Sequence, residues 1–353
     1  MSRWTRQRRV FFVEEPIRDA GDSRSRLNVH REACGVYVVQ PHIAGPGAQE
    51  GLTLQGLYRD LFDEYGIRDP VSWYYSPMFV PATRGLSSSV VVYDCMDELA
   101  AFQGAPSTLV GFEDELLARA DLLFTGGRSL YEHKRLRHPS AHIFASSVDT
   151  EHFRRARRPT VDPPDQCEIP HPRLGYFGVI DERMDLQLLA DVARLRPSWH
   201  IVLLGPTVKI DVDSIPKRPN IHLLGQKSYD DLPRYLAGWD VALLPFALND
   251  ATRFISPTKT PEYLAGGKPV VATPIRDVVT PYGDEGLVQI ARDGQQTVAA
   301  VEAIEREGPH ARTARADRFL STMSWDRTFS SIAALVERQG ANARGRVALG
   351  VSL

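Results

Sequence analysis

The stretch S-P-T-K-T-P-E-Y-L-A-G-G-K-P-V-V-A-T, residues 256–273, predicts a very short helix that is followed at once by a buried strand. Thr260 can cap this helix and Pro261 suits its first position, while Gly266 and Gly267 can form the left-handed turn that ends it. Such a helix between a polar loop and an apolar strand is typical of an open α/β sheet, so this stretch indicates the fold class.

Glu262 is the single acidic residue of this stretch and lies near the start of the predicted helix. In open α/β sheets, ligands collect at the carboxyl ends of strands beside helix N-termini, where free N–H groups meet anionic groups such as phosphates. A carboxylate in that place can accept hydrogen bonds from hydroxyl groups of the same ligand. The stretch therefore predicts a site for a nucleotide or a nucleotide-sugar.

Short β-branched runs alternate with helical stretches along the whole chain, which indicates parallel sheets. In the first half, the expected strands are residues 10–13, 36–39, 72–75, 90–93 and 122–125 of a single parallel sheet. In the second half, they are residues 174–177, 199–204, 221–224, 241–244, 270–272 and 287–290. We therefore predict an α/β fold with two Rossmann-like domains.

The stretch between the two halves, residues 154–172, is rich in proline and arginine and has the composition of a linker. We expect an N-terminal domain over 1–153, a C-terminal domain over 173–322, a final helix over 323–337 and a flexible tail over 338–353. A chain of 353 residues, 43% of them hydrophobic, is long enough to bury two cores of ordinary size.

Charge and cysteine content exclude several classes of protein. The formal net charge is −2, from 42 basic and 44 acidic side chains, so no overall field attracts nucleic acid. The three cysteines are widely spaced and indicate neither a disulfide framework nor a structural zinc site.

No apolar run reaches the roughly 18–20 residues that cross a bilayer. We expect a cytoplasmic protein, whose Arg-rich start is either a solvated helix face or a peripheral contact with anionic lipid at the inner membrane face.

Residues 256–273 resemble the donor-binding segment of retaining, GT-B-fold glycosyltransferases of the family 4 type, and further segments share this resemblance. These segments are V-F-F-V-E-E-P (10–16), V-V-Y-D-C-M-D-E (91–98), A-R-A-D-L-L-F-T (118–125), S-V-D-T-E-H-F (147–153), L-G-Y-F-G-V-I-D-E-R (174–183), L-P-F (244–246) and M-S-W-D (323–326). Together they look like bacterial teichuronic-acid-type and capsule-type transferases.

The resemblance implies the GT-B architecture, in which two Rossmann-like domains face each other and the last helix crosses back to the first domain. It also implies transfer of a sugar, with retention of configuration, from a nucleoside-diphosphate sugar to a carbohydrate or lipid-linked acceptor in cell-envelope or exopolysaccharide synthesis. UDP is the expected nucleotide. No metal cofactor is expected, because two cations can offset the charge that develops on the leaving diphosphate.

The resemblance and the local sequence together assign a donor site. Glu262 is expected to bind the ribose, Arg183 and Lys259 to act on the diphosphate, and the loop with Gln226 and Tyr229 to hold the base. The expected donor-site residues are Gly178, Arg183, Gln226, Tyr229, Asn249, Thr258, Lys259 and Glu262. The alternatives are structural: a tight turn at Gly175 and Gly178, a solvated Lys259, a turn at Asn249 and Asp250, and a simple strand-to-helix connection after Gly225.

One position departs from the family pattern of two glutamates separated by seven residues. Glu262 matches the second glutamate, and Phe254 stands where the first is expected. This departure bears on the contacts to the donor sugar, for which Asn249 and Asp250 are the nearby replacements.

Asp94 and Asp97 follow an apolar strand and are the candidate catalytic acids of the first half, together with Arg183 and Lys259 of the second. Either acid can orient the acceptor hydroxyl or take its proton. The alternative is that these acids cap the next helix. A competing interpretation is that these acids are paired carboxylates of the glycosidase type. It gives no role to the loops that are expected to bind phosphate.

In similar proteins, the strand matching residues 10–13 is the second of its sheet. We therefore expect the N-terminal domain to lack its first strand, as if the chain began at an internal methionine. Two other functions are consistent with these features. One is a nucleotide-sugar epimerase with the same two-domain architecture, and the other is a truncated, non-catalytic binding or assembly partner.

Overall fold

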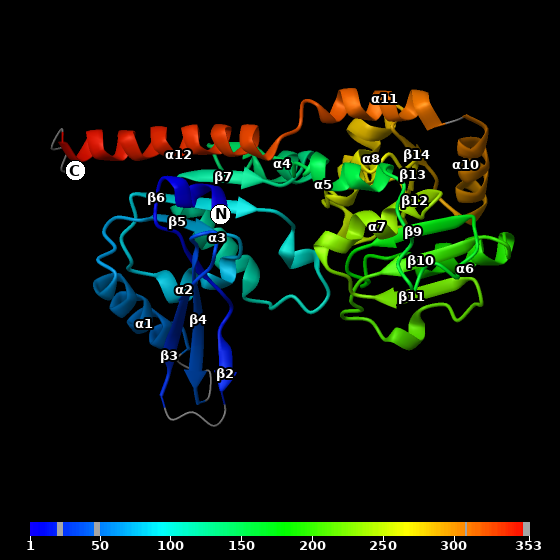
Figure 1. Ribbon diagram of the computed structural model, residues 1–353. Coiled ribbons are helices and arrows are strands. Elements are labelled where there is room, and N and C mark those ends of the chain that lie inside the picture. The colour runs from blue at the N-terminus through cyan, green and yellow to red at the C-terminus, as the bar shows by residue number, and fades with distance from the viewer. Residues whose placement is uncertain (20–23, 46–49, 308, 349–353) are drawn as a thin grey trace. The chain divides into compact units, whose positions relative to one another are not determined.

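The computed structural model describes residues 1–19, 24–45, 50–307 and 309–348, which form two compact units (Figure 1). Met1–Asp94, Ser107–Leu123 and Ser331–Leu353 make up the first unit, and Cys95–Pro106 and Phe124–Ser330 make up the second. The domain limits that we expect from the sequence stay a prediction.

The strands form three sheets. They are β1 (Phe11–Val13), β2 (Ile17–Asp19), β3 (Arg26–Arg31), β4 (Tyr37–Ala44), β5 (Val71–Tyr74), β6 (Val90–Cys95), β7 (Leu122–Thr125), β8 (Ala141–Ile143), β9 (Arg173–Phe177), β10 (His200–Leu204), β11 (Ile221–Gly225), β12 (Val241–Leu244), β13 (Val270–Ala272) and β14 (Val288–Ile290). The orders are β1-β4-β2 with β3 also paired to β4, then β5-β6-β7-β8, and β11-β10-β9-β12-β13-β14.

Helices connect most of these strands. The α-helices are α1 (Glu50–Glu64), α2 (Val80–Thr83), α3 (Leu109–Arg119), α4 (Arg128–Lys134), α5 (Thr150–Arg154), α6 (Leu186–Leu195), α7 (Leu232–Ala237), α8 (Lys259–Ala265), α9 (Arg276–Val278), α10 (Gly294–Glu307), α11 (Pro309–Leu320) and α12 (Trp325–Ala348). The shorter helical segments are η1 (Ser2–Arg6), η3 (Pro77–Phe79), η4 (Leu99–Ala101), η5 (Arg155–Arg157), η6 (Val212–Ser214), η7 (Tyr229–Asp231), η8 (Asp250–Thr252) and η9 (Val279–Gly283).

The sheet of the second unit has the doubly wound Rossmann order. Its strands pair in parallel, and the chain starts in the middle at β9, moves out through β10 and β11, and then returns to β12 on the other side of β9. All six strands expected for the second half are present, and the α/β class with two Rossmann-like parts is confirmed. The strand order reverses between β9 and β12, which is where such sheets bind ligands.

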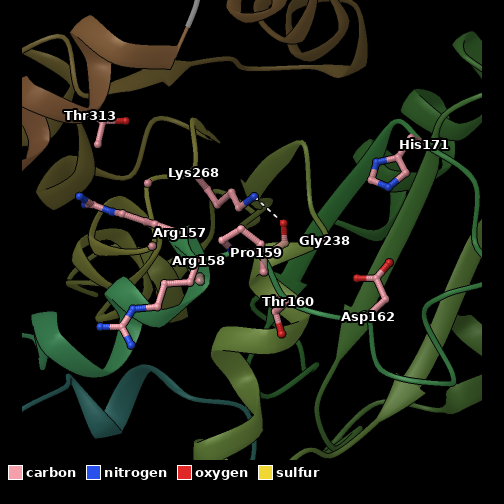
Figure 2. Close-up of a pocket in the computed structure, with 13 residues that line it drawn as sticks. Arg157, Arg158, Pro159, Thr160, Asp162, His171, Gly238, Lys268 and Thr313 are labelled. Atoms are coloured by element: carbon pink, nitrogen blue, oxygen red, sulfur yellow. Dashed lines mark hydrogen bonds between the residues drawn. The ribbon is translucent and has the colours of Figure 1, made fainter.

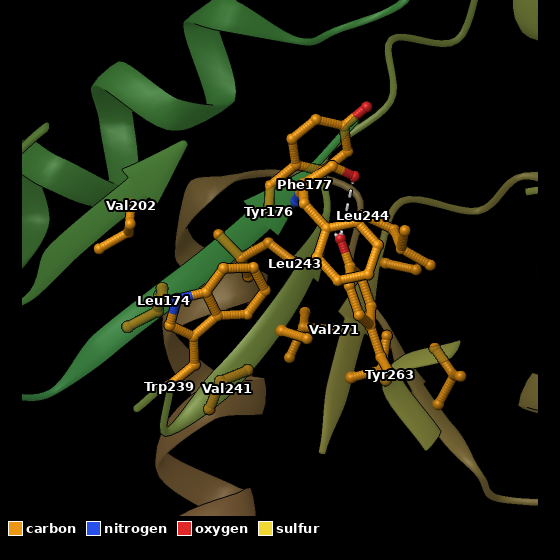
Figure 3. Close-up of a cluster of buried hydrophobic side chains, with 14 of the residues drawn as sticks. Leu174, Tyr176, Phe177, Val202, Trp239, Val241, Leu243, Leu244, Tyr263 and Val271 are labelled. Atoms are coloured by element: carbon orange, nitrogen blue, oxygen red, sulfur yellow. Dashed lines mark hydrogen bonds between the residues drawn. The ribbon is translucent and has the colours of Figure 1, made fainter. Parts of the chain in front are cut away.

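The core of the second unit packs around Trp239, which is 2% exposed (Figure 3). Gly175 lies within β9 and faces the indole ring, and a β-carbon at residue 175 would overlap this ring. Gly175 therefore does not belong to the turn after β9, as the sequence suggested, but makes room for Trp239. The indole Nε1 donates a hydrogen bond to Gln166 Oε1 at 2.9 Å, so the buried ring leaves no polar atom unpaired.

The first half of the chain differs from the single parallel sheet that we expected. β4 pairs in parallel with β1 and β2, and in antiparallel with β3, whereas β5 to β8 form a separate sheet. The antiparallel pair was missed because β3 alternates exposed and half-buried residues instead of forming an apolar run. It turns into β4 through Gly35, whose φ of +88° favours glycine.

The last helix is longer than predicted. α12 continues to Ala348, beyond the end expected at residue 337, so most of the tail expected to be flexible is helical. Residues 349–353 lie outside the described residues. In the described part of the chain, no helix combines the length and the apolar character needed to cross a bilayer.

Candidate functional site

The ends of β9 and β12 bring the candidate donor residues of the second unit together. Gly178 follows β9 directly and has a φ of +143°, a conformation that favours glycine. A β-carbon at Gly205, just after β10, would overlap the carbonyl oxygen of Gly178, so the two glycines let these chain segments approach closely. Gly178 N donates a hydrogen bond to the Leu204 carbonyl oxygen at 2.9 Å, which holds the turn after β9 against the end of β10 at the carboxyl edge of the sheet.

The side chain of Lys259 lies against Gly178. A β-carbon at residue 178 would lie 2.5 Å from Lys259 Cε and 3.2 Å from its Nζ. Lys259 is the first residue of α8, and Tyr263 anchors this helix, because the Tyr263 hydroxyl accepts a hydrogen bond from Phe177 N at 2.9 Å (Figure 3). Tyr263 is completely buried, so α8 is fixed to the end of β9.

Arg183 supplies the second cation of the site. Its Nη2 lies 2.6 Å from Asp181 Oδ2 and its Nε lies 3.0 Å from Asp181 Oδ1, which fixes the guanidinium in a two-pronged ion pair. The guanidinium carbon also lies 5.4 Å from the centre of the Phe102 ring. Burial acts against the charge, but the pair with Asp181 raises the pKa of Arg183, so this side chain stays a cation.

Glu262 lies one turn further along α8 and is partly buried. Burial raises the pKa of its carboxyl group to about 7, and the nearby Lys259 ammonium opposes this shift. Burial likewise lowers the pKa of Lys259. Among the described residues, no side chain or backbone group donates a hydrogen bond to the Glu262 carboxylate. A partly buried carboxylate without donors favours a ligand that brings hydroxyl groups.

Asp97 faces the same two cations. Burial raises the pKa of its carboxyl group, while Arg183 and then Lys259 oppose the shift. The segment that carries it is held by the next residue, Glu98, whose Oε2 lies 2.7 Å from the Nζ of the fully buried Lys134. The structure therefore brings Asp97, Arg183, Lys259 and Glu262 into one charged group beside Gly178.

The start of α8 differs in detail from the prediction. Thr258, not Thr260, is the N-cap residue, and its side chain makes no capping hydrogen bond. Thr260 is buried inside the helix, and its hydroxyl has no hydrogen-bond partner among the described residues. Pro261 is the third helical residue. The left-handed turn after the helix is present, since Gly267 has a φ of +76°.

Tyr229 lies near Glu262, and both Tyr229 and Gln226 are exposed on the segment after β11. The Tyr229 ring stacks on His152 with ring centres 4.2 Å apart, and its carbonyl oxygen lies 3.0 Å from His152 Nε2. Burial, with Glu262 as the next cause, raises the pKa of Tyr229 to about 12. The exposed face of this ring thus lies close to the charged group.

Asn249 has a local structural role. Its Oδ1 accepts a hydrogen bond from Thr252 N at 3.1 Å and caps η8, and its Nδ2 donates to the Glu182 carbonyl oxygen at 3.1 Å. Phe254, which stands at the position of the expected first glutamate, stacks on His133 with ring centres 4.7 Å apart. Neither arrangement supplies a carboxylate in place of that glutamate.

Asp94 belongs to the first unit. Its Oδ2 accepts a hydrogen bond from Trp73 Nε1 at 3.1 Å, and burial raises the pKa of its carboxyl group to about 6. Asp94 and Asp97 therefore have different surroundings, although three residues separate them in the sequence.

Three contacting residues were not predicted as part of the site. Asp181 and Phe102 hold Arg183, and Tyr263 ties α8 to β9. For Asp181, its position two residues before Arg183 was a usable signal. The helix that follows, α6, is capped by Asp185, whose Oδ1 accepts a hydrogen bond from Leu188 N at 2.8 Å.

Residues 171–306 match the family model described as glycosyl transferases group 1. The chain is also 26% identical over 220 residues to TuaH of Bacillus subtilis (strain 168), described as a putative teichuronic acid biosynthesis glycosyltransferase. This match covers 57% of the chain and 54% of TuaH, so the chain spans about half the length of this curated relative. The family resemblance expected from the sequence is confirmed.

Solved structures share the fold at low sequence identity. Sucrose-phosphate synthase from Thermosynechococcus elongatus superposes with a TM-score of 0.74 at 13% identity, covering 97% of this chain and 91% of that one. HepE of Anabaena, solved in complex with UDP and glucose, gives a TM-score of 0.62 at 14% identity, covering 85% and 86%. These likenesses confirm the GT-B fold.

Proposed function

We propose that this chain, whose residues 171–306 belong to the group 1 glycosyltransferase family, transfers a sugar from a nucleoside-diphosphate sugar to a carbohydrate or lipid-linked acceptor. The observation that carries the proposal is the convergence of Lys259, Arg183 and Glu262 at the point where the strand order of the second sheet reverses. Two cations and one acid at the carboxyl ends of parallel strands match a diphosphate with an attached ribose.

In this proposal, the diphosphate lies over Gly178, between the Lys259 ammonium and the Arg183 guanidinium. Glu262 accepts hydrogen bonds from the ribose hydroxyl groups, which supply the donors that its carboxylate lacks. The exposed face of Tyr229 adjoins the base. UDP is the proposed nucleotide, and the similarity to HepE, a structure with UDP and glucose bound, supports this choice.

The reaction breaks the bond between the anomeric carbon of the sugar and an oxygen of the β-phosphate. Arg183 and Lys259 offset the negative charge that develops on the leaving diphosphate. The acceptor hydroxyl forms the new bond to the anomeric carbon, with net retention of configuration, and its proton passes to Asp97 or to the leaving phosphate. The raised pKa of Asp97 suits a group that takes up this proton.

The proposed acceptor belongs to cell-envelope or exopolysaccharide synthesis. The similarity to TuaH, described for teichuronic acid biosynthesis, supports an acceptor of this class. Three further donor contacts are proposed, at Gln226, Thr258 and Asn249. The side chain of Asn249 also caps η8.

A thermal-shift panel with UDP, GDP, dTDP and ADP tests the donor site. A ligand at 100 times its dissociation constant stabilises the native state by about 2.7 kcal/mol, so one nucleotide of the panel should raise the melting temperature clearly. The matching nucleotide-sugar is then incubated with and without candidate acceptors. Product that appears only with an acceptor supports transfer, whereas conversion of the donor alone indicates an epimerase.

A further inference from the structure

A hollow lies at the opposite end of α8 from Lys259. It has a volume of about 710 Å³ and is lined by residues of the second unit (Figure 2). Most of them come from three segments, which are residues 156–162, the end of α7 at Ala237 and Gly238, and the turn Gly266 to Lys268, and His171 and Thr313 complete the lining. This volume is in the range of about 300–1,000 Å³ that is typical of pockets for small molecules.

A smaller hollow of about 240 Å³ adjoins the first and shares Arg158, Pro159 and Thr160 with it. Arg155 and Arg234 line this smaller hollow as well. We call the two together the linker pocket. Its charged lining is mostly basic, with Arg155, Arg157, Arg158, Arg234 and Lys268 against the single carboxylate of Asp162.

Part of this charge is already balanced within the protein. Two nitrogens of Arg157 each lie 2.8 Å from an oxygen of Asp317, and Arg173 Nη1 lies 2.5 Å from Asp162 Oδ2. Because Asp162 is paired with Arg173, its carboxylate does not offset the other cations of the pocket.

Lys268 is oriented by the backbone. Its Nζ donates hydrogen bonds to the carbonyl oxygens of Ala237 and Trp239, both at 2.8 Å (Figure 2 shows the lysine in the pocket). An ammonium group has three protons, so one remains for a further acceptor.

Three guanidinium groups are not balanced. In the residues that the structure describes, Arg155, Arg158 and Arg234 form no ion pair, and all three line the smaller hollow. Like charges around one hollow repel one another, and an anion bound between them removes this repulsion. The planar fork of a guanidinium matches two oxygens of a phosphate group.

We propose that the linker pocket binds a phosphate-bearing ligand through Arg155, Arg158 and Arg234, with Lys268 and Thr160 as further lining contacts. This site is separate from the proposed donor site, since α8 carries Lys259 at one end and leads into Gly266 and Lys268 at the other. The phosphate belongs either to a free phosphorylated compound or to the headgroup of an anionic lipid.

Calorimetry of the full chain with inorganic pyrophosphate tests this site. The titration uses a Lys259→Met background, so that the proposed donor site does not contribute. We expect pyrophosphate to bind this variant, and we expect the added double substitution Arg155→Gln/Arg158→Gln to weaken binding by about tenfold or more, the effect of at least one lost charge-assisted contact. The exposed Arg292, elsewhere on the second unit, provides the control Arg292→Gln, which should leave the affinity unchanged.

Cosedimentation of the wild-type chain with vesicles identifies the source of the phosphate. Binding to phosphatidylglycerol vesicles but not to phosphatidylcholine vesicles, lost in Arg155→Gln/Arg158→Gln, assigns the site to a lipid headgroup. Pyrophosphate binding without vesicle binding assigns it to a free compound. If the Lys259→Met chain does not bind pyrophosphate, or if the arginine substitutions leave its affinity unchanged, the proposal is wrong. Neither result bears on the binding of UDP by the wild-type chain.

Discussion

The side chain of Lys259 packs directly against the backbone of Gly178. A β-carbon at residue 178 would lie only 2.5 Å from the Cε of Lys259 and would overlap with it. The glycine also has a φ of +143°, which other residues rarely adopt. The two residues are 81 positions apart in the sequence, and the lack of a side chain at residue 178 leaves room for the cation of α8 at the carboxyl end of β9.

Gly178→Ala should therefore displace Lys259 and weaken nucleotide binding. The added methyl group also forces a strained φ, so we expect a loss of about 1–3 kcal/mol in the free energy of unfolding. Urea unfolding and calorimetry with UDP measure the two effects. The control is Gly56→Ala in α1, where a β-carbon meets nothing within 4 Å and stability should rise slightly. Nucleotide affinity that survives Gly178→Ala would show that Lys259 does not need this position.

Glu262 predicts how stability depends on pH in the unliganded protein. Its pKa rises from an ordinary value of 4.5 to about 7 on folding, so the folded state holds the proton more tightly than the unfolded state. This contribution is complete below about pH 4.5 and is lost as the pH rises through 7. Between pH 5 and pH 8, the wild type should lose about 1–3 kcal/mol relative to Glu262→Gln, measured by urea unfolding at each pH. Parallel curves for both proteins would contradict the assigned pKa.

The buried pair Lys134–Glu98 supports the segment that carries Asp97. Lys134 is fully buried and its Nζ lies 2.7 Å from Glu98 Oε2. Lys134→Met leaves the carboxylate without this cation, so we expect a loss of about 3–5 kcal/mol in unfolding free energy. The double variant Lys134→Met/Glu98→Gln should recover part of the loss, because the unpaired charge is gone. Purely additive effects in this double-mutant cycle would mean that the two groups do not interact.

Asp277 caps a helix that lies far away in the sequence. Its Oδ1 accepts a hydrogen bond from Ser129 N at 2.9 Å at the start of α4, where the N-cap residue Gly127 has no side chain. Asp277→Ala should cost about 1–2 kcal/mol in thermal or urea unfolding, the usual value of a lost cap. Asp277→Asn keeps an acceptor oxygen and serves as the matched control. Equal stability of the alanine and asparagine variants would exclude the capping role.

The second sheet was predictable from the sequence because each of its strands is a short apolar run between loops. β9, β12 and β13 are buried along their whole length, which is the pattern that a doubly wound parallel sheet produces. The first half was predicted less well, since β3 has an exposed face and pairs with β4 as a hairpin.

The site was predictable in its residue types but not in its contacts. Glu262, Lys259 and Arg183 were proposed from local patterns together with the family resemblance, since loops after parallel strands meet at one edge of the sheet. Local sequence patterns do not specify side-chain directions. They therefore could not predict the pairing of Arg183 with Asp181, the anchoring of α8 through Tyr263, or the hydrogen bond from Trp73 to Asp94.

The most direct test of the central claim is isothermal titration calorimetry of UDP with the wild-type chain and with Glu262→Ala, alongside circular dichroism of both proteins. We expect the wild type to bind UDP and Glu262→Ala to bind it about tenfold or more weakly, with an unchanged spectrum, because the ribose hydroxyl groups lose a charged acceptor. Equal affinity of the two folded proteins for UDP would contradict the placement of the nucleotide beside Glu262.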